Sequence, residues 1–145
     1  MTAITGISHI YLPVRDVDEA VEFYTQKLGF YLLRKYLWNE RPAAYVGLDG
    51  VLLELSNSDS TPSVDGRTEL RLGVAVSDMD EALSELRAKG VEVVREPWQA
   101  FTFWGRQAQI RDPSGYIISI REWRHPDGPD YEGWQPESEA VVRTG

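Results

Sequence analysis

The sequence contains no cysteine, which excludes disulfide bonds, thiolate metal ligands and a cysteine nucleophile. It also lacks an apolar run near the roughly 18 residues that a membrane-spanning helix needs. Its first residues show neither a basic region nor an apolar core, so we expect no targeting segment. Basic residues are scarce, at 15 against 23 acidic ones, and the net charge of −8 argues against nucleic-acid binding. We expect a cytoplasmic protein that binds neither nucleic acids nor membranes.

The 145 residues are the length of one ordinary domain, and a hydrophobic content of 42% is enough for a packed core. The last stretch differs in composition, because residues 125–145 are rich in acidic residues and proline. We expect this acidic, Pro-rich tail to lack regular structure over most of its length, and we expect its His125 to be exposed.

The most informative feature of the chain is an internal repeat. The segment HIYLPVRDVDEAVEFYTQKLGF at 9–30 matches RLGVAVSDMDEALSELRAKGV at 71–91, with Asp16 and Asp78 at equivalent positions, 62 residues apart. Such a repeat indicates two copies of one module of roughly 60 residues, each too small to bury a good core alone. The predicted boundaries are 5–56 for module one, 57–68 for a polar linker and 69–124 for module two.

Each copy has the pattern of a strand, a helix and three further strands. Alternation of apolar and polar residues predicts the strands. Asp16 and Asp78 are candidate helix N-caps, each followed three residues later by glutamate, and Gly29 and Gly90 are candidate C-terminal caps. The predicted strands are 7–14, 30–38, 43–48 and 51–56, then 70–76, 91–96, 106–111 and 116–123. Each module is therefore predicted to be βαβββ, and the fold class to be α+β.

The alternation also predicts which side chains face away from the helices. The apolar positions of each first strand must face the helix, so His9 lies on the opposite face, and Arg71 does so by the repeat. On the fourth strands the corresponding positions are Glu54 and Ser119. We expect these four residues to line one concave face.

These features together resemble the vicinal oxygen chelate superfamily, which includes glyoxalase I, extradiol dioxygenases, fosfomycin-resistance enzymes and bleomycin-resistance proteins. The resemblance covers roughly residues 5–124 as a single domain and rests on the two repeat copies and on WGRQAQIRDPSGYIISI near the end. It implies two βαβββ modules in tandem that form a half-open mixed β-sheet cup with the helices outside. It also implies a small-molecule ligand and a homodimer.

The resemblance also identifies candidate metal ligands. Metal-using members typically carry His or Gln on the first strand and Glu on the fourth strand of each module. His9 and Glu54 match this pattern, but Arg71 and Ser119 occupy the equivalent positions of module two. Arginine keeps a fixed positive charge and serine is a poor replacement for a carboxylate, and two ligands are fewer than a catalytic zinc usually has. We therefore expect no cofactor; if zinc, nickel or iron binds, His9 and Glu54 are its ligands.

Three roles are open for Glu54. A carboxylate on a largely apolar strand needs a partner, and we favour an ion pair with Arg71. Alternatively, Glu54 or His9 is a catalytic base and Arg71 binds an anionic oxygen. Glu54 could also be the counter-charge for a cationic ligand.

Five tryptophans are more than a core of this size requires. Aromatic residues stack on flat ligands, but they also fill cores and dimer interfaces, so both roles remain open. The turn sequence Asp112-Pro113-Ser114-Gly115 is assigned no function beyond a turn. The candidate ligand-binding residues are Trp38, Phe101, Phe103, Trp104, Ser119, Arg121 and Trp123.

Three functions are compatible with these residues. The favoured one is a small-molecule-binding protein of the glyoxalase/bleomycin-resistance type, which holds a flat or amphipathic ligand in an aromatic-lined cup without a complete metal site. The second is a metal-dependent enzyme of the glyoxalase or dioxygenase kind. The third is a cofactor-free lyase or isomerase that uses His9, Glu54 and Arg71. The fold alone does not choose among them.

Overall fold

The computed structural model describes residues 7–58, 71–100, 105–136 and 138–145. The chain divides into two compact units. The first unit contains residues 1–67 together with 112–115, and the second contains 68–111 and 116–145. The short segment 112–115 thus belongs to the first unit, whereas the residues on either side of it belong to the second.

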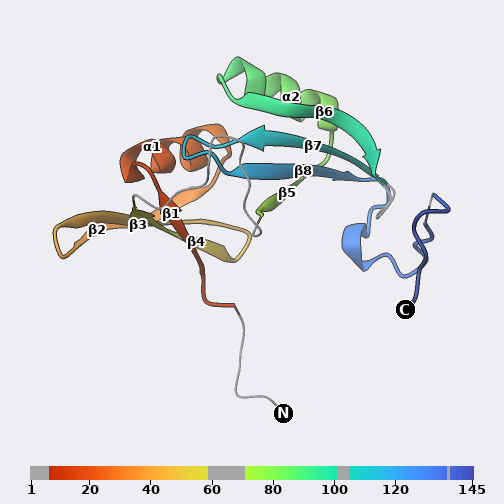
Figure 1. Ribbon diagram of the computed structural model, residues 1–145, viewed down its shortest axis with the longest axis horizontal. Helices are drawn as coiled ribbons and strands as arrows, with labels where there is room; N and C mark the ends of the chain where they lie inside the picture. Colours follow the sequence, from red (N-terminus) through yellow and green to blue (C-terminus); the bar gives the residue numbers. More distant parts are fainter. Residues whose placement is uncertain (1–6, 59–70, 101–104, 137) are drawn as a thin grey trace, which may run out of the picture. The chain divides into compact units, whose positions relative to one another are not determined.

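The first unit is a four-stranded mixed sheet with a helix on one face (Figure 1). The strand order is β1-β4-β3-β2, with β1 parallel to β4 and the other neighbours antiparallel. Helix α1 packs against β3 and β4. The elements are β1 (Ile10–Val14), α1 (Val17–Glu22), the π-helical turn η1 (Phe23–Lys27), β2 (Tyr31–Trp38), β3 (Arg41–Leu48) and β4 (Val51–Asn57).

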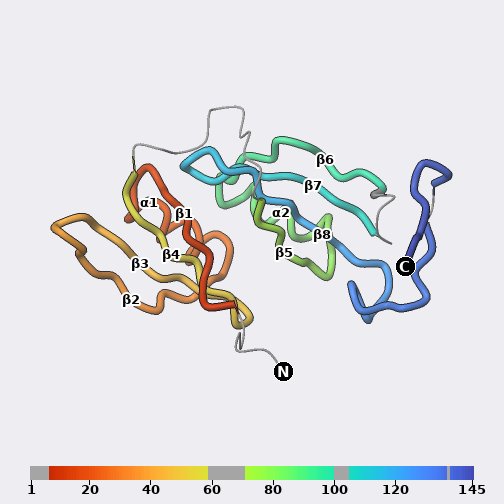
Figure 2. Tube along the Cα trace, turned by 60° about the horizontal axis from the view of Figure 1, so that its bottom comes forward, coloured from red at the N-terminus to blue at the C-terminus, as the bar shows by residue number. Residues whose placement is uncertain are grey.

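The second unit repeats this arrangement with the strand order β5-β8-β7-β6 (Figure 2). Helix α2 packs against β6 and β8. Both modules are therefore βαβββ, and the predicted α+β fold class is confirmed. The elements are β5 (Gly73–Val76), α2 (Met79–Ala88), β6 (Glu92–Ala100), β7 (Gly105–Arg111), β8 (Ile117–Trp123) and the 3-10 turn η2 (Gly128–Asp130) in the tail.

The predicted helix caps are present in both units. The Asp16 carboxylate accepts a hydrogen bond from the backbone N–H of Glu19 at 3.0 Å, and Asp78 accepts one from that of Glu81 at the same distance. The predicted C-terminal glycines, Gly29 and Gly90, have φ values of 82° and 79°. This left-handed conformation is one that glycine adopts without a steric penalty.

The first helix departs from a regular α-helix in its last turns. The cap signals at Asp16 and Gly29 predicted one continuous helix, but η1 is a π-helical turn in which the backbone N–H of Leu28 donates to the carbonyl of Phe23 at 3.1 Å. The wider turn buries two consecutive side chains, Phe23 and Tyr24, at 3% and 0% exposure.

Each sheet buries the alternating apolar positions that face its helix, as the sequence predicted. The first strand of each module begins later than predicted. Strand β1 begins at Ile10 and β5 at Gly73, so His9 and Arg71 precede their strands. The described helices include none that is long and apolar enough to cross a membrane. The core positions include Val14, Ala44, Val46, Leu53 and Leu55 in the first unit and Ala108, Ile110, Ile118 and Ile120 in the second.

Candidate functional site

The face of the first sheet that is turned away from α1 carries the predicted residue Glu54. In the strand register, Tyr11 lies beside Glu54, Glu54 beside Tyr45, and Tyr45 beside Arg34. Side chains paired in this way lie on the same side of a sheet. The alternate positions Leu53 and Leu55 are buried, so Glu54 faces away from the core, as predicted.

Tyr45 is the partner of Glu54 in this unit, and the sequence analysis did not identify it. The Tyr45 hydroxyl donates a hydrogen bond to the Glu54 carboxylate. This bond, followed by burial and the neighbouring Tyr36, raises the pKa of Tyr45 above the usual tyrosine range. Tyr36 stacks on Tyr45 with ring centroids 5.7 Å apart, and the His9 ring meets Tyr45 edge-on at 6.1 Å. Tyr45 therefore joins His9, Glu54 and Tyr36 in one contiguous group.

The donor set does not fit a complete metal site. Within either unit, the described residues hold no group of three or more His, Asp or Glu side chains placed to bind an ion. Glu54 is already hydrogen-bonded to Tyr45, and the equivalent positions in the second unit are Arg71 and Ser119. A permanent cation and a neutral hydroxyl are not the imidazole and carboxylate ligands that such an ion requires.

The second sheet carries a group of polar residues on the face turned away from α2. One row across this sheet contains Gly73, Ser119, Gln109 and Arg95. The next row contains Ala75, Arg121, Gln107 and Trp98. We call this surface the open face of the second unit.

A hollow of about 510 Å³ lies on the open face of the second unit. On strand β5, Gly73 has no side chain and Ala75 has only a methyl group, which leaves room above the sheet. The residues that line the hollow are Arg71, Gly73, Val74, Ala75, Gln107, Ser119, Arg121 and Trp123.

Hydrogen bonds and stacking hold the polar side chains of this face. The Nε of Arg121 donates to the Gln107 side-chain carbonyl at 3.1 Å. The Arg95 guanidinium lies 3.5 Å from the centre of the Trp98 ring, a cation–π contact. Ser119 is only 7% exposed and lies at the edge of the hollow.

The structure thus gathers four predicted site residues around one hollow: Arg71, Ser119, Arg121 and Trp123. Trp38 lies elsewhere, in the first unit at the end of β2, with 67% of its surface exposed. Phe101, Phe103 and Trp104 lie outside the described residues. The predicted ion pair of Glu54 with Arg71 would join the two units and remains a prediction.

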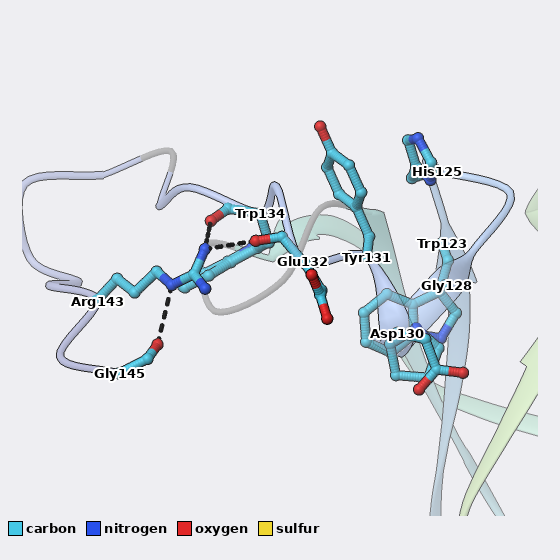
Figure 3. Close-up of a pocket in the computed structure, with 10 residues that line it drawn as sticks. Trp123, His125, Gly128, Asp130, Tyr131, Glu132, Trp134, Arg143 and Gly145 are labelled. Atoms are coloured by element: carbon cyan, nitrogen blue, oxygen red, sulfur yellow. Dashed lines mark hydrogen bonds between the residues drawn. The ribbon is translucent and has the colours of Figure 1, made fainter.

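The C-terminal tail surrounds a second hollow of about 360 Å³ within the second unit (Figure 3). Trp123, at the end of β8, lines both hollows. Arg143 ties the tail together, because its Nη1 donates to the carbonyls of Glu132 and Trp134 at 2.8 and 2.6 Å. The described part of the tail contains only the turn η2, as expected.

His125 differs from its prediction. The sequence placed it as an exposed residue, but it is half-buried and its ring stacks on Tyr131 with centroids 3.8 Å apart. Two flat rings exclude water from each other when they stack, so they fix this end of the tail.

The segment 112–115 does more than turn the chain. Asp112 is 3% exposed, and its carboxylate accepts hydrogen bonds at 2.9 Å from the Tyr24 hydroxyl and from the backbone N–H of Ser114. The Ser114 hydroxyl accepts a bond from the backbone N–H of Arg15 at 2.9 Å. The sequence pattern predicted only the turn, because it cannot show where the turn packs.

Comparisons with known proteins agree with this architecture. Residues 6–120 match the model of the Glyoxalase/Bleomycin resistance protein/Dioxygenase superfamily. The chain belongs to this superfamily. The resemblance drawn from the repeat is therefore confirmed, and it extends over most of the chain.

The superfamily members similar to this chain include both enzymes and binding proteins. A probable lactoylglutathione lyase of Synechocystis sp. is 32% identical over 119 residues, covering 77% of this chain and 91% of the relative. Another, from Vibrio cholerae, is 31% identical over 124 residues, covering 79% and 88%. Among solved structures, TnmS3, an antibiotic binding protein from Streptomyces sp. CB03234, is 29% identical with a TM-score of 0.69, covering 84% of this chain and 98% of that one.

Proposed function

We propose that this superfamily member binds a flat or amphipathic small molecule in the hollow of the second unit and does so without a complete metal site. The observation that carries the proposal is the identity of the residues at the metal-ligand positions of the second module. Arg71 and Ser119 occupy those positions, and both line a hollow of about 510 Å³ beside Trp123. The size is within the usual range of small-molecule pockets.

The similarity to an antibiotic binding protein supports this proposal. TnmS3 shares 29% of its residues with this chain and has the same fold over 84% of it. A binding role needs a concave surface with an aromatic wall and a few oriented polar groups. Trp123 and Trp98 provide aromatic surface on the open face, and the Arg121–Gln107 hydrogen bond provides an oriented polar pair.

A substitution at Gly73 can fill the hollow without changing the charge of the residues that line it. A Cβ added at Gly73 would meet no atom closer than 3.9 Å, so a larger side chain has room there. We expect Gly73→Leu to fold normally and to abolish binding of 2-naphthamide, a flat neutral probe, measured by titration calorimetry. Gly73→Ala is the matched control and retains binding. Undiminished affinity in the leucine variant would overturn the location of the site.

The absence of a complete metal site has its own test. Elemental analysis after dialysis should find no stoichiometric zinc, nickel or iron in the parent protein. The combined change Arg71→His with Ser119→Glu supplies the imidazole and carboxylate of the metal-using pattern, and it should create measurable zinc or nickel affinity. One equivalent of metal in the parent protein would contradict the proposal.

The second candidate is an enzyme, and the names of two relatives favour it. The chain is 32% and 31% identical to probable lactoylglutathione lyases, and it keeps His9 and Glu54 in the first module. The discriminating assay is lactoylglutathione formation, with and without added nickel or zinc. Activity that is lost in Glu54→Gln would place the enzyme ahead of the binding protein; a cofactor-free lyase would instead be active with no metal added.

We also propose a cytoplasmic homodimer. Strand β2 is an edge strand of the first sheet and exposes apolar side chains on both sides of the charged pair Arg34 and Lys35. Natural proteins usually cover or interrupt the apolar surface of an edge strand. A second copy of the chain would cover this strand. The exposed apolar residues of β2 are Tyr31, Leu32, Leu33, Leu37 and Trp38.

A further inference from the structure

The open face of the second unit is cationic, although the chain as a whole carries a net charge of −8. Arg71 lines the hollow, and the strand register places Arg95 and Arg121 on the same face. On the described strands of this face the register places one carboxylate, that of Glu92, which lies 3.3 Å from the guanidinium of Arg111. The local charge near the hollow is therefore opposite in sign to that of the protein.

The polar groups around the hollow are mainly hydrogen-bond donors. Arg71 and Arg121 each carry a guanidinium with several N–H donors and no acceptor. The Gln107 side-chain carbonyl accepts from Arg121, so its amide NH₂ is the part of that side chain that remains to donate. Ser119 adds a hydroxyl at the edge of the hollow. Such a donor-rich surface matches a ligand that presents oxygen acceptors.

We infer that the hollow binds a planar organic anion, with its oxyanion group on Arg71 and Arg121 and its flat part against Trp123. The inference rests on the proposed function, because it names the class of ligand for the same hollow. Guanidinium groups match carboxylates in a bidentate geometry. The indole ring supplies a large flat apolar surface beside them. The small residues Gly73 and Ala75 leave room for the ligand between the arginines and the indole ring.

The first unit offers a contrast that strengthens the inference. The equivalent face there carries Glu54, which accepts a hydrogen bond from Tyr45, together with Tyr36 and Arg34. A carboxylate on that face disfavours an anion, whereas the arginine positions of the second unit favour one. The two modules have the same fold, but the first carries the Glu54 carboxylate on this face where the second carries the neutral Ser119.

The test compares two probes of the same shape, 2-naphthoate and the neutral 2-naphthamide, by titration calorimetry at low ionic strength. We expect the parent protein to bind the carboxylate at least about tenfold more tightly, which corresponds to about 1.4 kcal/mol. Arg71→Gln should remove most of this preference, because it should weaken binding of the carboxylate much more than binding of the amide. Because Arg71 is exposed and precedes β5, this change should not alter the melting temperature.

Three further variants complete the design. Arg121→Lys keeps the charge but loses the planar fork, so it should reduce the preference less than Arg121→Gln. Arg87→Gln, on α2 and ion-paired with Glu96, removes an arginine outside the hollow and should change neither affinity. Added salt should weaken carboxylate binding selectively.

The outcomes separate the inference from the proposed function. Equal affinities for the two probes, or a preference that survives both Arg71→Gln and Arg121→Gln, would overturn the anion preference while amide binding still supports a small-molecule site. Tighter binding of 2-naphthylmethylammonium would overturn it as well. Failure of all three probes to bind would contradict the proposed function together with the inference.

Discussion

The Tyr24 hydroxyl donates a 2.9 Å hydrogen bond to the Asp112 carboxylate, although 88 positions separate the two residues in the chain. Both side chains are buried, at 0% and 3% exposure. The bond ties the end of the first helix to the segment 112–115. A buried polar pair of this kind is costly to break, because the partner that remains loses its hydrogen bond away from water.

Removing that hydroxyl should destabilise the protein. We expect Tyr24→Phe to lower the free energy of unfolding by about 1–3 kcal/mol, since a buried carboxylate loses a donor. Urea denaturation measures the change. Tyr11→Phe, which alters an exposed tyrosine, should have little effect. If Tyr24→Phe in an Asp112→Ala background costs as much as it does alone, the pair is not coupled.

The Tyr45–Glu54 pair should make stability depend on alkaline pH. The pKa of Tyr45 is raised in the folded protein, whereas an unfolded tyrosine titrates near pH 10. The unfolded chain therefore loses this proton first, so the contribution is complete below about pH 10 and declines as the pH rises further. Tyr45→Phe should make the alkaline loss of stability shallower.

Glu54→Gln provides the spectroscopic check on the same pair. Replacing the carboxylate removes the main cause of the raised pKa, so one phenolate should appear at lower pH in the near-ultraviolet absorbance titration. Identical titration curves for the parent and the variant would show that Glu54 does not control Tyr45.

The turn between β2 and β3 contains a stability defect that can be repaired. Asn39 and Glu40 both have positive φ, at 48° and 64°, and glutamate is strained in this conformation. We expect Glu40→Gly to raise the free energy of unfolding by about 0.5–1 kcal/mol. Glu40→Gln keeps the strain and removes only the charge, so it should be near neutral. If Glu40→Gln raises the free energy of unfolding more than Glu40→Gly does, the loss of the charge and not the relief of strain is the cause.

The turn between β3 and β4 supplies the reciprocal test. Gly50 occupies the matching position with φ 77°, and an added Cβ would meet no atom within 4 Å. Gly50→Ala should therefore cost about 1 kcal/mol through backbone strain alone. A neutral result would contradict the strain argument at both turns.

The exposed edge strand β2 should be covered in a homodimer. Leu37 is 70% exposed at the centre of an apolar stretch of β2. We expect the parent protein to be dimeric by light scattering at micromolar concentration and Leu37→Lys to be monomeric with little change in melting temperature. Val142→Lys alters a similarly exposed apolar residue in the tail and should leave the dimer intact. A monomeric parent protein would contradict the proposal.

Local sequence patterns predicted the order and type of the main secondary-structure elements in both modules, but not the π-helical turn η1. The caps at Asp16 and Asp78 and the terminal glycines depend on neighbours within a few residues, and so does strand alternation. The alternation also predicted which face Glu54 and Ser119 occupy. The first residues of β1 and β5 were predicted less accurately, because pairing with β4 and β8 decides where these strands begin.

The repeat, the βαβββ order and the faces of the strands could be predicted from local sequence patterns, and so could the presence of Arg71 and Ser119 where the first module has His9 and Glu54. The folded chain was needed to show that Tyr45 lies beside Glu54, that Tyr24 contacts Asp112, and that Arg71, Arg121 and Trp123 line one hollow. These contacts depend on strand register and on packing between distant segments. Periodicity specifies the side of a strand on which a residue lies, but not its neighbour on the next strand.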